Sequence, residues 1–277
     1  IDVKHDSFNI DPTKLPDALN TAKDLGINVK GIMPVGLFGQ PAEMDLINDF
    51  AKNNNLWVLD DAAQSFGGMH KKEVVGNLSE AAATSFFPAK PLGCYGDGGA
   101  VFTNDREIYE IANSSHIHGM GKKRYEYDRI GMNARMSTIQ AAILLEKLEI
   151  FPEELQKRQM VADNYNKNLS ALNLSIELPE IYKNFKSSWA QYTILLPEKI
   201  NRNKLQEYLK SKNIPTAIYY PIPLNEHKPY NTYPISDSGL DVTYYLSKNV
   251  LSLPMHPYLK EDEVIYISES IKNFVKN

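Results

Sequence analysis

The chain has 277 residues, 43% hydrophobic and 23% charged, a balance that is ordinary for a folded protein and excludes global disorder. Its 30 basic and 34 acidic side chains leave a net charge of −4, so no basic excess indicates a nucleic-acid-binding protein. The single cysteine, Cys94, excludes an internal disulfide, and no apolar run approaches the roughly 18 residues that span a membrane. With no secretory signal at its start, the chain is predicted to be cytoplasmic, with no membrane or nucleic-acid partner.

Strand-like and helix-like segments alternate through the first half of the chain. Short apolar runs predict buried strands at residues 29–35, 56–59, 81–87 and 100–103. Helical spacing of apolar residues predicts helices at residues 18–25, 41–53 and 105–114. This alternation is typical of a parallel sheet with crossover helices, in which ligands bind beyond the carboxyl ends of the strands. Asp61 and the segment after Phe87 fall at two such ends.

The second half predicts a smaller α+β unit. Residues 136–148 form an apolar helical face, through Ile139, Ile143, Leu144 and Leu148. Pro152 is expected to interrupt this helix before another helix begins. The later elements are predicted as helices at 153–172, 204–212 and 261–275, with strands at 191–196 and 216–220. We therefore predict an α/β fold with a mostly parallel large domain over 1–151 and a small domain over 152–277.

The first motif is a pair of aspartates, Asp60 and Asp61, followed by Ala62, Ala63 and Gln64. A carboxylate at the end of a buried strand is poorly solvated and needs a partner. A cationic ring nitrogen of a cofactor would be one partner, and a backbone amide or an arginine another. From the spacing alone, a structural cap for the following helix is the favoured interpretation.

The second motif runs from Thr84 through Ser85 to Lys90, before a glycine-rich stretch at residues 93–99. A lysine in an apolar, enclosed loop has a lowered pKa, which makes its amine a nucleophile for an aldehyde. Ser85 is suited to bind a phosphate, and glycines allow close backbone approach. The alternative is an exposed lysine beside a turn-rich loop. Neither a P-loop nor a dinucleotide-binding glycine fingerprint is present, which disfavours a nicotinamide-dependent dehydrogenase.

The third motif spans residues 131–136, just before the helix predicted at 136–148. Asn133 could cap that helix or bind an anion near its positive end. Arg135 could clamp a carboxylate or a phosphate. Six histidines occur without the close helical spacing of a zinc site, so no metal is predicted. His118 precedes Gly119 and is a hypothetical contact for a sugar nucleotide.

Taken in order, these stretches resemble the DegT/DnrJ/EryC1/StrS family of pyridoxal-phosphate (PLP) sugar aminotransferases. The resemblance lies in residues 34–40, 61–64, 85–90, 96–100 and 131–135 and extends over essentially the whole chain. It implies a fold-type I PLP-dependent transferase. It also implies a homodimer with active sites at the interface, glutamate as amine donor and a keto nucleotide sugar as acceptor.

The resemblance also assigns roles to individual residues. Lys90 would bond covalently to PLP and carry the proton transferred during the reaction, while Asp61 would pair with the pyridine nitrogen. Gln64 would lie near the phenolic oxygen of the cofactor. Ser85 would hold its phosphate, and Asn133 would reach the phosphate of the neighbouring subunit.

A finer resemblance concerns residues 85–103, 140–145, 220–225 and 253–259. They are similar to the branch that aminates C3 of UDP-2-acetamido-2-deoxy-3-oxo-glucuronate for surface-polysaccharide synthesis, including lipopolysaccharide. Arg135 is then the candidate cation for the uronate carboxylate, and Tyr219 and Tyr220 would lie near the substrate. One alternative keeps the chemistry but moves it to C4 of a 4-keto-6-deoxy nucleotide sugar.

The resemblance further implies a segment before the strand at which this chain begins. In the family that segment supplies part of the phosphate site and of the substrate pocket. The expectation is therefore an N-terminally truncated member, and a second alternative is a non-catalytic fragment that keeps the fold without binding PLP.

Overall fold

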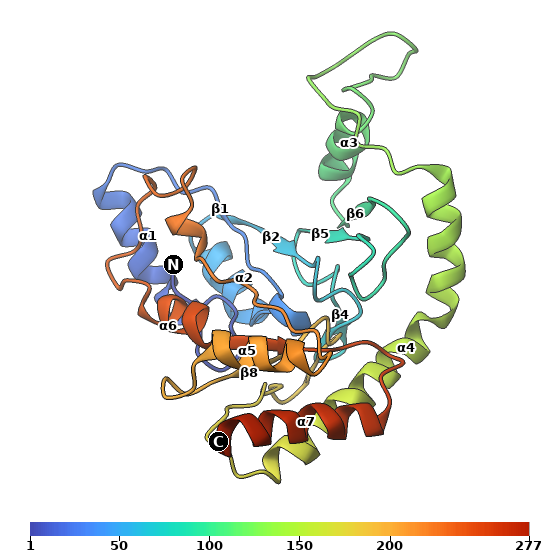
Figure 1. Cartoon of the computed structure of the whole chain (residues 1–277). Helices are drawn as coiled ribbons and strands as arrows, with labels where there is room; N and C mark the ends of the chain where they lie inside the picture. The colour runs from blue at the N-terminus through green and yellow to red at the C-terminus, as the bar shows by residue number, and fades with distance from the viewer. Residues whose placement is uncertain (277) are drawn as a thin grey trace.

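The computed structural model describes residues 1–276 and is built around a four-stranded sheet (Figure 1). The strand order is β1-β2-β5-β6, and the first three strands run parallel while β6 pairs antiparallel with β5. The bounds of these strands are Gly31–Ile32, Trp57–Asp61, Ala81–Ser85 and Gly99–Thr103. The predicted mostly parallel sheet is therefore confirmed, with one antiparallel edge strand.

Helix α2 covers one face of this sheet because its apolar residues recur at helical spacing. Met44, Ile47 and Ala51 are buried and pack with Ile32 of β1 and Val58 of β2. Asp105 caps α3, where its side chain accepts hydrogen bonds from the N–H groups of the first turn. The helices of this half are α1 (Leu15–Asp24), α2 (Met44–Asn53) and α3 (Arg106–Ser115).

The C-terminal half packs around a separate core. Its members come from the second part of α4, from β8 and β9, and from α5 and α7, with Tyr165 and Tyr192 stacked at 4.6 Å. The bounds are α4 (Thr138–Ser170), β8 (Tyr192–Leu195), α5 (Arg202–Ser211), α6 (Asp241–Asn249), β9 (Val250–Leu253) and α7 (Glu261–Lys276). A small antiparallel sheet of β3 (Met69–His70), β4 (Glu73–Val74) and β7 (Phe185–Lys186) adjoins both halves.

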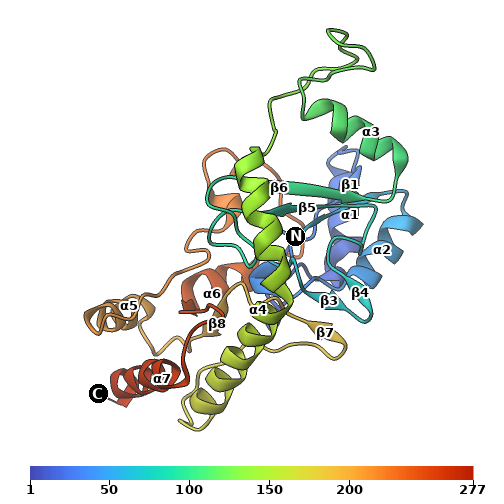
Figure 2. The same ribbon diagram turned by 90° about the vertical axis from the view of Figure 1, so that its right-hand side faces the viewer.

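The predicted break at Pro152 is wrong, because α4 continues through this proline without interruption (Figure 2). A proline inside a helix removes one backbone hydrogen bond, yet burial of Phe151, Val161 and Tyr165 holds the helix together on both sides. The division into domains 1–151 and 152–277 stays a prediction. The two largest cores draw their buried members from Leu15–Ala82 and Val161–Ile271.

The strand predicted at 216–220 is also wrong. Only Ala217 makes a bridge, to Ser252 of β9, because the chain then turns away toward the site described below. Within residues 1–276, no helix combines the length and the apolar character needed to cross a bilayer.

Candidate active site

The carboxyl ends of the neighbouring parallel strands β2 and β5 bring the first two motifs together. Asp61 ends β2 and lies in register with Ala83 of β5, and the loop after β5 carries Lys90. Asp61 and Lys90 line one cavity of about 640 Å³, together with Gln64 and Tyr220. A cavity of this size is in the range that holds a small-molecule ligand.

Lys90 is half-buried in this cavity, and its surroundings favour the uncharged amine. Burial lowers the pKa of Lys90, and the negative charge of Asp61 opposes part of that shift. The backbone N–H of Lys90 donates to the carbonyl oxygen of Phe87 at 2.9 Å, which fixes the turn that carries the side chain. An amine with a lowered pKa is a better nucleophile at neutral pH.

Asp61 and Asp60 point to opposite faces of β2, as successive strand residues must. The Oδ1 atom of Asp61 accepts a hydrogen bond from the N–H of Ala63 at 3.1 Å, so this side chain caps the turn after β2 and also lines the cavity. Because a turn and not a helix follows β2, the predicted helix cap is wrong, and the role of Asp61 toward a cofactor stays a prediction.

Asp60 was not singled out for a role by the sequence pattern, and its environment is unusual. It is fully buried, and neither of its carboxyl oxygens has a hydrogen-bond partner within residues 1–276. Burial, with a smaller contribution from the charge of Asp61, raises the pKa of Asp60 to about 7. This carboxyl therefore keeps a proton far above its ordinary titration range.

Gln64 connects three segments of the site. Its Oε1 atom accepts a hydrogen bond from the N–H of Phe38 at 2.7 Å, and its Nε2 atom donates to the hydroxyl of Tyr220 at 3.3 Å. Its backbone carbonyl accepts a third bond, from the Ser188 hydroxyl. Burial raises the pKa of Tyr220, so its hydroxyl stays protonated and can accept and donate at once.

Ser85 ends β5 but is not part of the lining of the 640 Å³ cavity. Its hydroxyl accepts a hydrogen bond from the N–H of Phe87 at 3.2 Å. The loop beyond it returns tightly to β6, and at Gly93 a Cβ atom would lie 2.6 Å from the carbonyl oxygen of Phe87. Glycine is therefore required where this loop packs against its own backbone.

Residues 116–137, which we call the arm, project from the body between α3 and α4 (Figure 1; Figure 2). His118, Asn133 and Arg135 all lie on the arm, and none of them lines the cavity of its own chain. Asn133 does not cap α4, because that cap is Ser137, whose hydroxyl accepts from the N–H of Gln140. Instead, Asn133 accepts a hydrogen bond from Nε of Arg135 at 2.9 Å.

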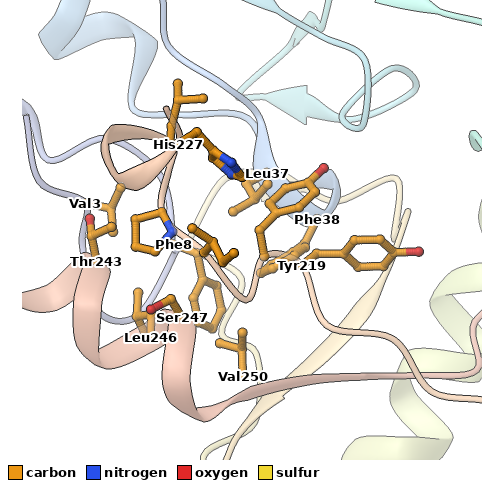
Figure 3. Close-up of a pocket in the computed structure, with 14 residues that line it drawn as sticks. Val3, Phe8, Leu37, Phe38, Tyr219, His227, Thr243, Leu246, Ser247 and Val250 are labelled. Carbon is orange, nitrogen blue, oxygen red and sulfur yellow. The ribbon is translucent and has the colours of Figure 1, made fainter. Parts of the chain in front are cut away.

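Tyr219 and Tyr220 contact each other edge to face, with ring centroids 5.5 Å apart. Tyr219 lies in the wall of a second cavity of about 470 Å³, next to the first (Figure 3). The walls of this second cavity are mainly apolar, and they include Phe8, Leu246 and Val250. Because it contains neither Lys90 nor Asp61, the second cavity is not where the reactive side chains meet.

Two further tyrosines, Tyr230 and Tyr233, line the 640 Å³ cavity and were missed in the sequence. They lie between Leu224 and α6, in a segment with no helical or strand periodicity. The only signal was a pair of aromatic residues in a stretch rich in turn-forming residues, which sequence patterns assign to a loop.

Comparison with known proteins identifies the family to which a chain with this set of site residues belongs. A model of the DegT/DnrJ/EryC1/StrS aminotransferase family matches residues 1–272. The chain belongs to this family.

Several relatives place this DegT/DnrJ/EryC1/StrS family member more closely. It is 43% identical over 275 residues to the UDP-2-acetamido-2-deoxy-3-oxo-D-glucuronate aminotransferase of Pseudomonas aeruginosa, covering 99% of this chain and 72% of that protein. A DegT DnrJ EryC1 StrS aminotransferase from Brucella abortus has a crystal structure that matches with a TM-score of 0.94 and 41% identity, over 99% of this chain and 72% of the other. NtdA of Bacillus subtilis, solved with bound cofactor PMP, matches with a TM-score of 0.86 and 26% identity, over 100% and 62% of the two chains.

The resemblance read from the sequence is thus confirmed at the level of the family, its fold and its PLP-dependent aminotransferase activity. In this DegT/DnrJ/EryC1/StrS aminotransferase, the residues expected to contact PLP do not all meet. Asp61, Gln64 and Lys90 share a cavity within one chain, whereas Ser85, at the end of β5, and Asn133, on the arm, lie outside its lining.

Proposed function

We propose that this chain transfers the amino group of glutamate to C3 of UDP-2-acetamido-2-deoxy-3-oxo-glucuronate, with PLP as its cofactor. The observation that carries the proposal is the shared cavity of Lys90, Asp61 and Gln64 in a chain that is 43% identical to the Pseudomonas enzyme of that name. In the net reaction, glutamate becomes 2-oxoglutarate and the C3 carbonyl of the sugar becomes an amine. No outside oxidant or reductant is needed.

The residues of the cavity suit PLP by the chemistry of their donors. A lysine with a lowered pKa offers an amine for the aldehyde, and a carboxylate at the end of a strand offers a partner for a protonated ring nitrogen. Lys90 would hold the cofactor covalently, Asp61 would pair with the ring nitrogen, and Gln64 would lie beside the ring. Bound PLP supplies the electron sink that lets a proton leave the amine-bearing carbon.

The proton chemistry then falls to Lys90. Its Nζ atom would take a proton from one carbon and return it to another. Burial lowers the pKa of this amine, which makes the uncharged form that accepts a proton easier to reach. The carboxylate of Asp61 would face the ring nitrogen and favour its protonation.

We further propose that the active unit is a homodimer in which Asn133 and Arg135 act in the cavity of the partner subunit. Two observations support this. The arm that carries them exposes large apolar side chains, with Ile130 at 100% and Met132 at 66% of their possible surface. The first turns of α4 also expose Ile139, from the face that the sequence predicted to be apolar. Exposed apolar surface of this extent marks an interaction site.

In that arrangement Arg135 would bind the uronate carboxylate, since guanidinium groups match carboxylates in geometry and charge. Asn133 would contact the phosphate of PLP, together with Ser85. His118 lies beside the same arm segment, where its N–H donates to the carbonyl oxygen of Met132. We propose His118 as a contact for the nucleotide sugar, and Tyr219 and Tyr220 as contacts from the body.

An absorbance spectrum with PLP, taken before and after glutamate is added, tests the proposal. We expect a visible cofactor band that bleaches with glutamate in the native chain and is absent in Lys90→Ala. Lys52→Ala, at an exposed position on α2, is the matched control and should behave as the native chain does. Bleaching in Lys90→Ala, or none in the native chain, would contradict the proposal.

The acceptor is tested separately with the amine-loaded enzyme. We expect the band to return with the 3-oxo-glucuronate nucleotide and not with a 4-keto-6-deoxy nucleotide sugar. The opposite preference would move the reaction to C4. Arg135→Ala should raise KM for the uronate and leave the glutamate KM less affected.

A further inference from the structure

One part of the wall of the 640 Å³ cavity is aromatic and carries no charged side chain. Tyr230 and Tyr233 line the same cavity as Lys90 and Asp61, and Pro234 and Ile235 continue the wall. We propose that Tyr230 and Tyr233 form the platform on which the nucleobase of the nucleotide sugar stacks. This inference rests on the proposed function, because it assumes that the acceptor is a nucleotide sugar.

The shape of the substrate indicates that its base contacts Tyr230 and Tyr233. The reacting carbonyl must lie at Lys90, and the base is joined to the sugar through a diphosphate, so the base contacts a part of the cavity wall other than the one that carries Lys90. Tyr230 and Tyr233 remain 44% and 66% exposed, with ring centroids 6.2 Å apart and planes tilted by 32°. Flat aromatic faces that stay exposed in a cavity are suited to stacking against a base.

The charges of the cavity wall support a base rather than a phosphate at this end. Among the described residues that line it, Asp61 is the sole carboxylate and Lys90 the sole side-chain cation, and the sequence-predicted roles occupy both. The tyrosine end offers ring faces and hydroxyl groups, which can also hydrogen-bond the polar edge of a base. A diphosphate would instead need cations, and neither tyrosine nor the adjoining Pro234 and Ile235 supplies one.

The segment that carries the tyrosines is anchored on both sides. Before them, Asn225 donates a hydrogen bond to the hydroxyl of Tyr244 at 2.8 Å. After them, the N–H groups of Asp237 and Ser238 donate to Thr21 and Asp17 of α1 at 3.1 and 2.9 Å. These bonds hold the two ends of the segment against α1 and α6, and a site on an anchored segment loses less entropy on binding.

Calorimetric titration of the full chain with UDP tests the platform directly, because UDP carries the base and the diphosphate without the reacting sugar. We expect Tyr230→Ala and Tyr233→Ala each to weaken UDP binding about tenfold, since the stacking surface is lost. Tyr230→Phe and Tyr233→Phe keep the ring and should stay within about threefold of the native affinity. Tyr266→Ala, on α7 and 51% exposed, is the matched control and should bind UDP normally.

Inorganic pyrophosphate is the second probe and should bind equally to the native chain and to the alanine variants. Unchanged UDP affinity in both alanine variants overturns the platform, as does a native chain that does not bind UDP. A change in molar mass by light scattering in the alanine variants also overturns it, since the tyrosines would then hold a second copy. The glutamate-dependent bleaching of the native chain is measured alongside. If the native chain does not bleach but the alanine variants bind UDP more weakly, the proposed function alone is refuted. If the native chain bleaches but the alanine variants bind UDP as tightly as the native chain, the platform alone is refuted.

Discussion

The ends of β2 and β5 and the arm are both parts of the proposed active site, and they are built in opposite ways. Asp61, at the end of β2, and Gln64, in the turn after it, are fixed by hydrogen bonds within their own chain. The arm projects from the body and leaves Ile130 wholly exposed. One region gathers its side chains in the cavity of one chain, whereas the proposed role of the other requires the cavity of a partner subunit. The difference teaches that the chemistry and the substrate contacts can be separated experimentally.

The largest expected effect comes from Asp61. Asp61→Asn removes the charge that favours a protonated ring nitrogen, so the glutamate half-reaction should slow by about 10²- to 10⁴-fold. Stopped-flow absorbance measures this rate at a fixed glutamate concentration. The fold should persist, because asparagine can still accept the hydrogen bond from Ala63. A rate within about threefold of native would show that Asp61 serves only as the cap of its turn.

Mixing two variants with different defects, at a uronate concentration far below the raised KM of Arg135→Ala, tests whether the arm acts across subunits. Refolding Lys90→Ala with Arg135→Ala in equal amounts should restore up to about a quarter of the native sites, because half of the dimers are mixed and each has one intact site. Turnover of the 3-oxo-glucuronate nucleotide measures the recovery. Lys90→Ala mixed with Asp61→Asn is the control and should recover nothing, because both changes lie in the body. Equal recovery of activity in the two mixtures would show that the arm acts in the cavity of its own subunit.

In the buried region, Asp60 should make the free energy of unfolding depend on pH. Its pKa is raised from 3.8 to about 7, so its protonated form contributes stability fully below pH 3.8, and that contribution is lost as the pH rises through 7. The loss amounts to at most about 4 kcal/mol. Asp60→Asn cannot ionise, so its free energy of unfolding should exceed the native value at pH 8 by a few kcal/mol and by less at pH 5. Urea unfolding at both values checks this, and a pH-independent difference would contradict it.

The smallest expected effect is on the arm. Ile130→Ser should change the unfolding free energy of an isolated chain by less than about 0.5 kcal/mol, because the side chain has no packing to lose. The same change should shift the dimer toward monomer in sedimentation experiments. Leu144→Ala, at a buried position on α4, is the contrast and should destabilise the chain by about 2–5 kcal/mol. A large loss of stability in Ile130→Ser would mean that the arm packs on its own body.

Several features were predictable because they depend on local pattern. The periodicity of Met44 and Ile47 predicted α2, and Asp105 predicted the start of α3. The motifs at Asp61 and Lys90 predicted that both side chains would lie beyond strand ends, and they line one cavity. Parallel strands bring such ends together whatever the intervening sequence.

Other features depended on contacts between distant segments, which no local pattern encodes. Pro152 lies inside α4 because buried neighbours outweigh the lost hydrogen bond, although local propensity predicts a break there. Tyr230 and Tyr233 reach the cavity only because α1 and α6 anchor the loop between them. The sequence by itself determined the family and most of the strand and helix pattern, and it predicted Asp61 and Lys90 as the reactive residues. The tertiary structure alone decided which residues share the cavity and which remain outside it, because burial and hydrogen bonding between remote segments set those positions.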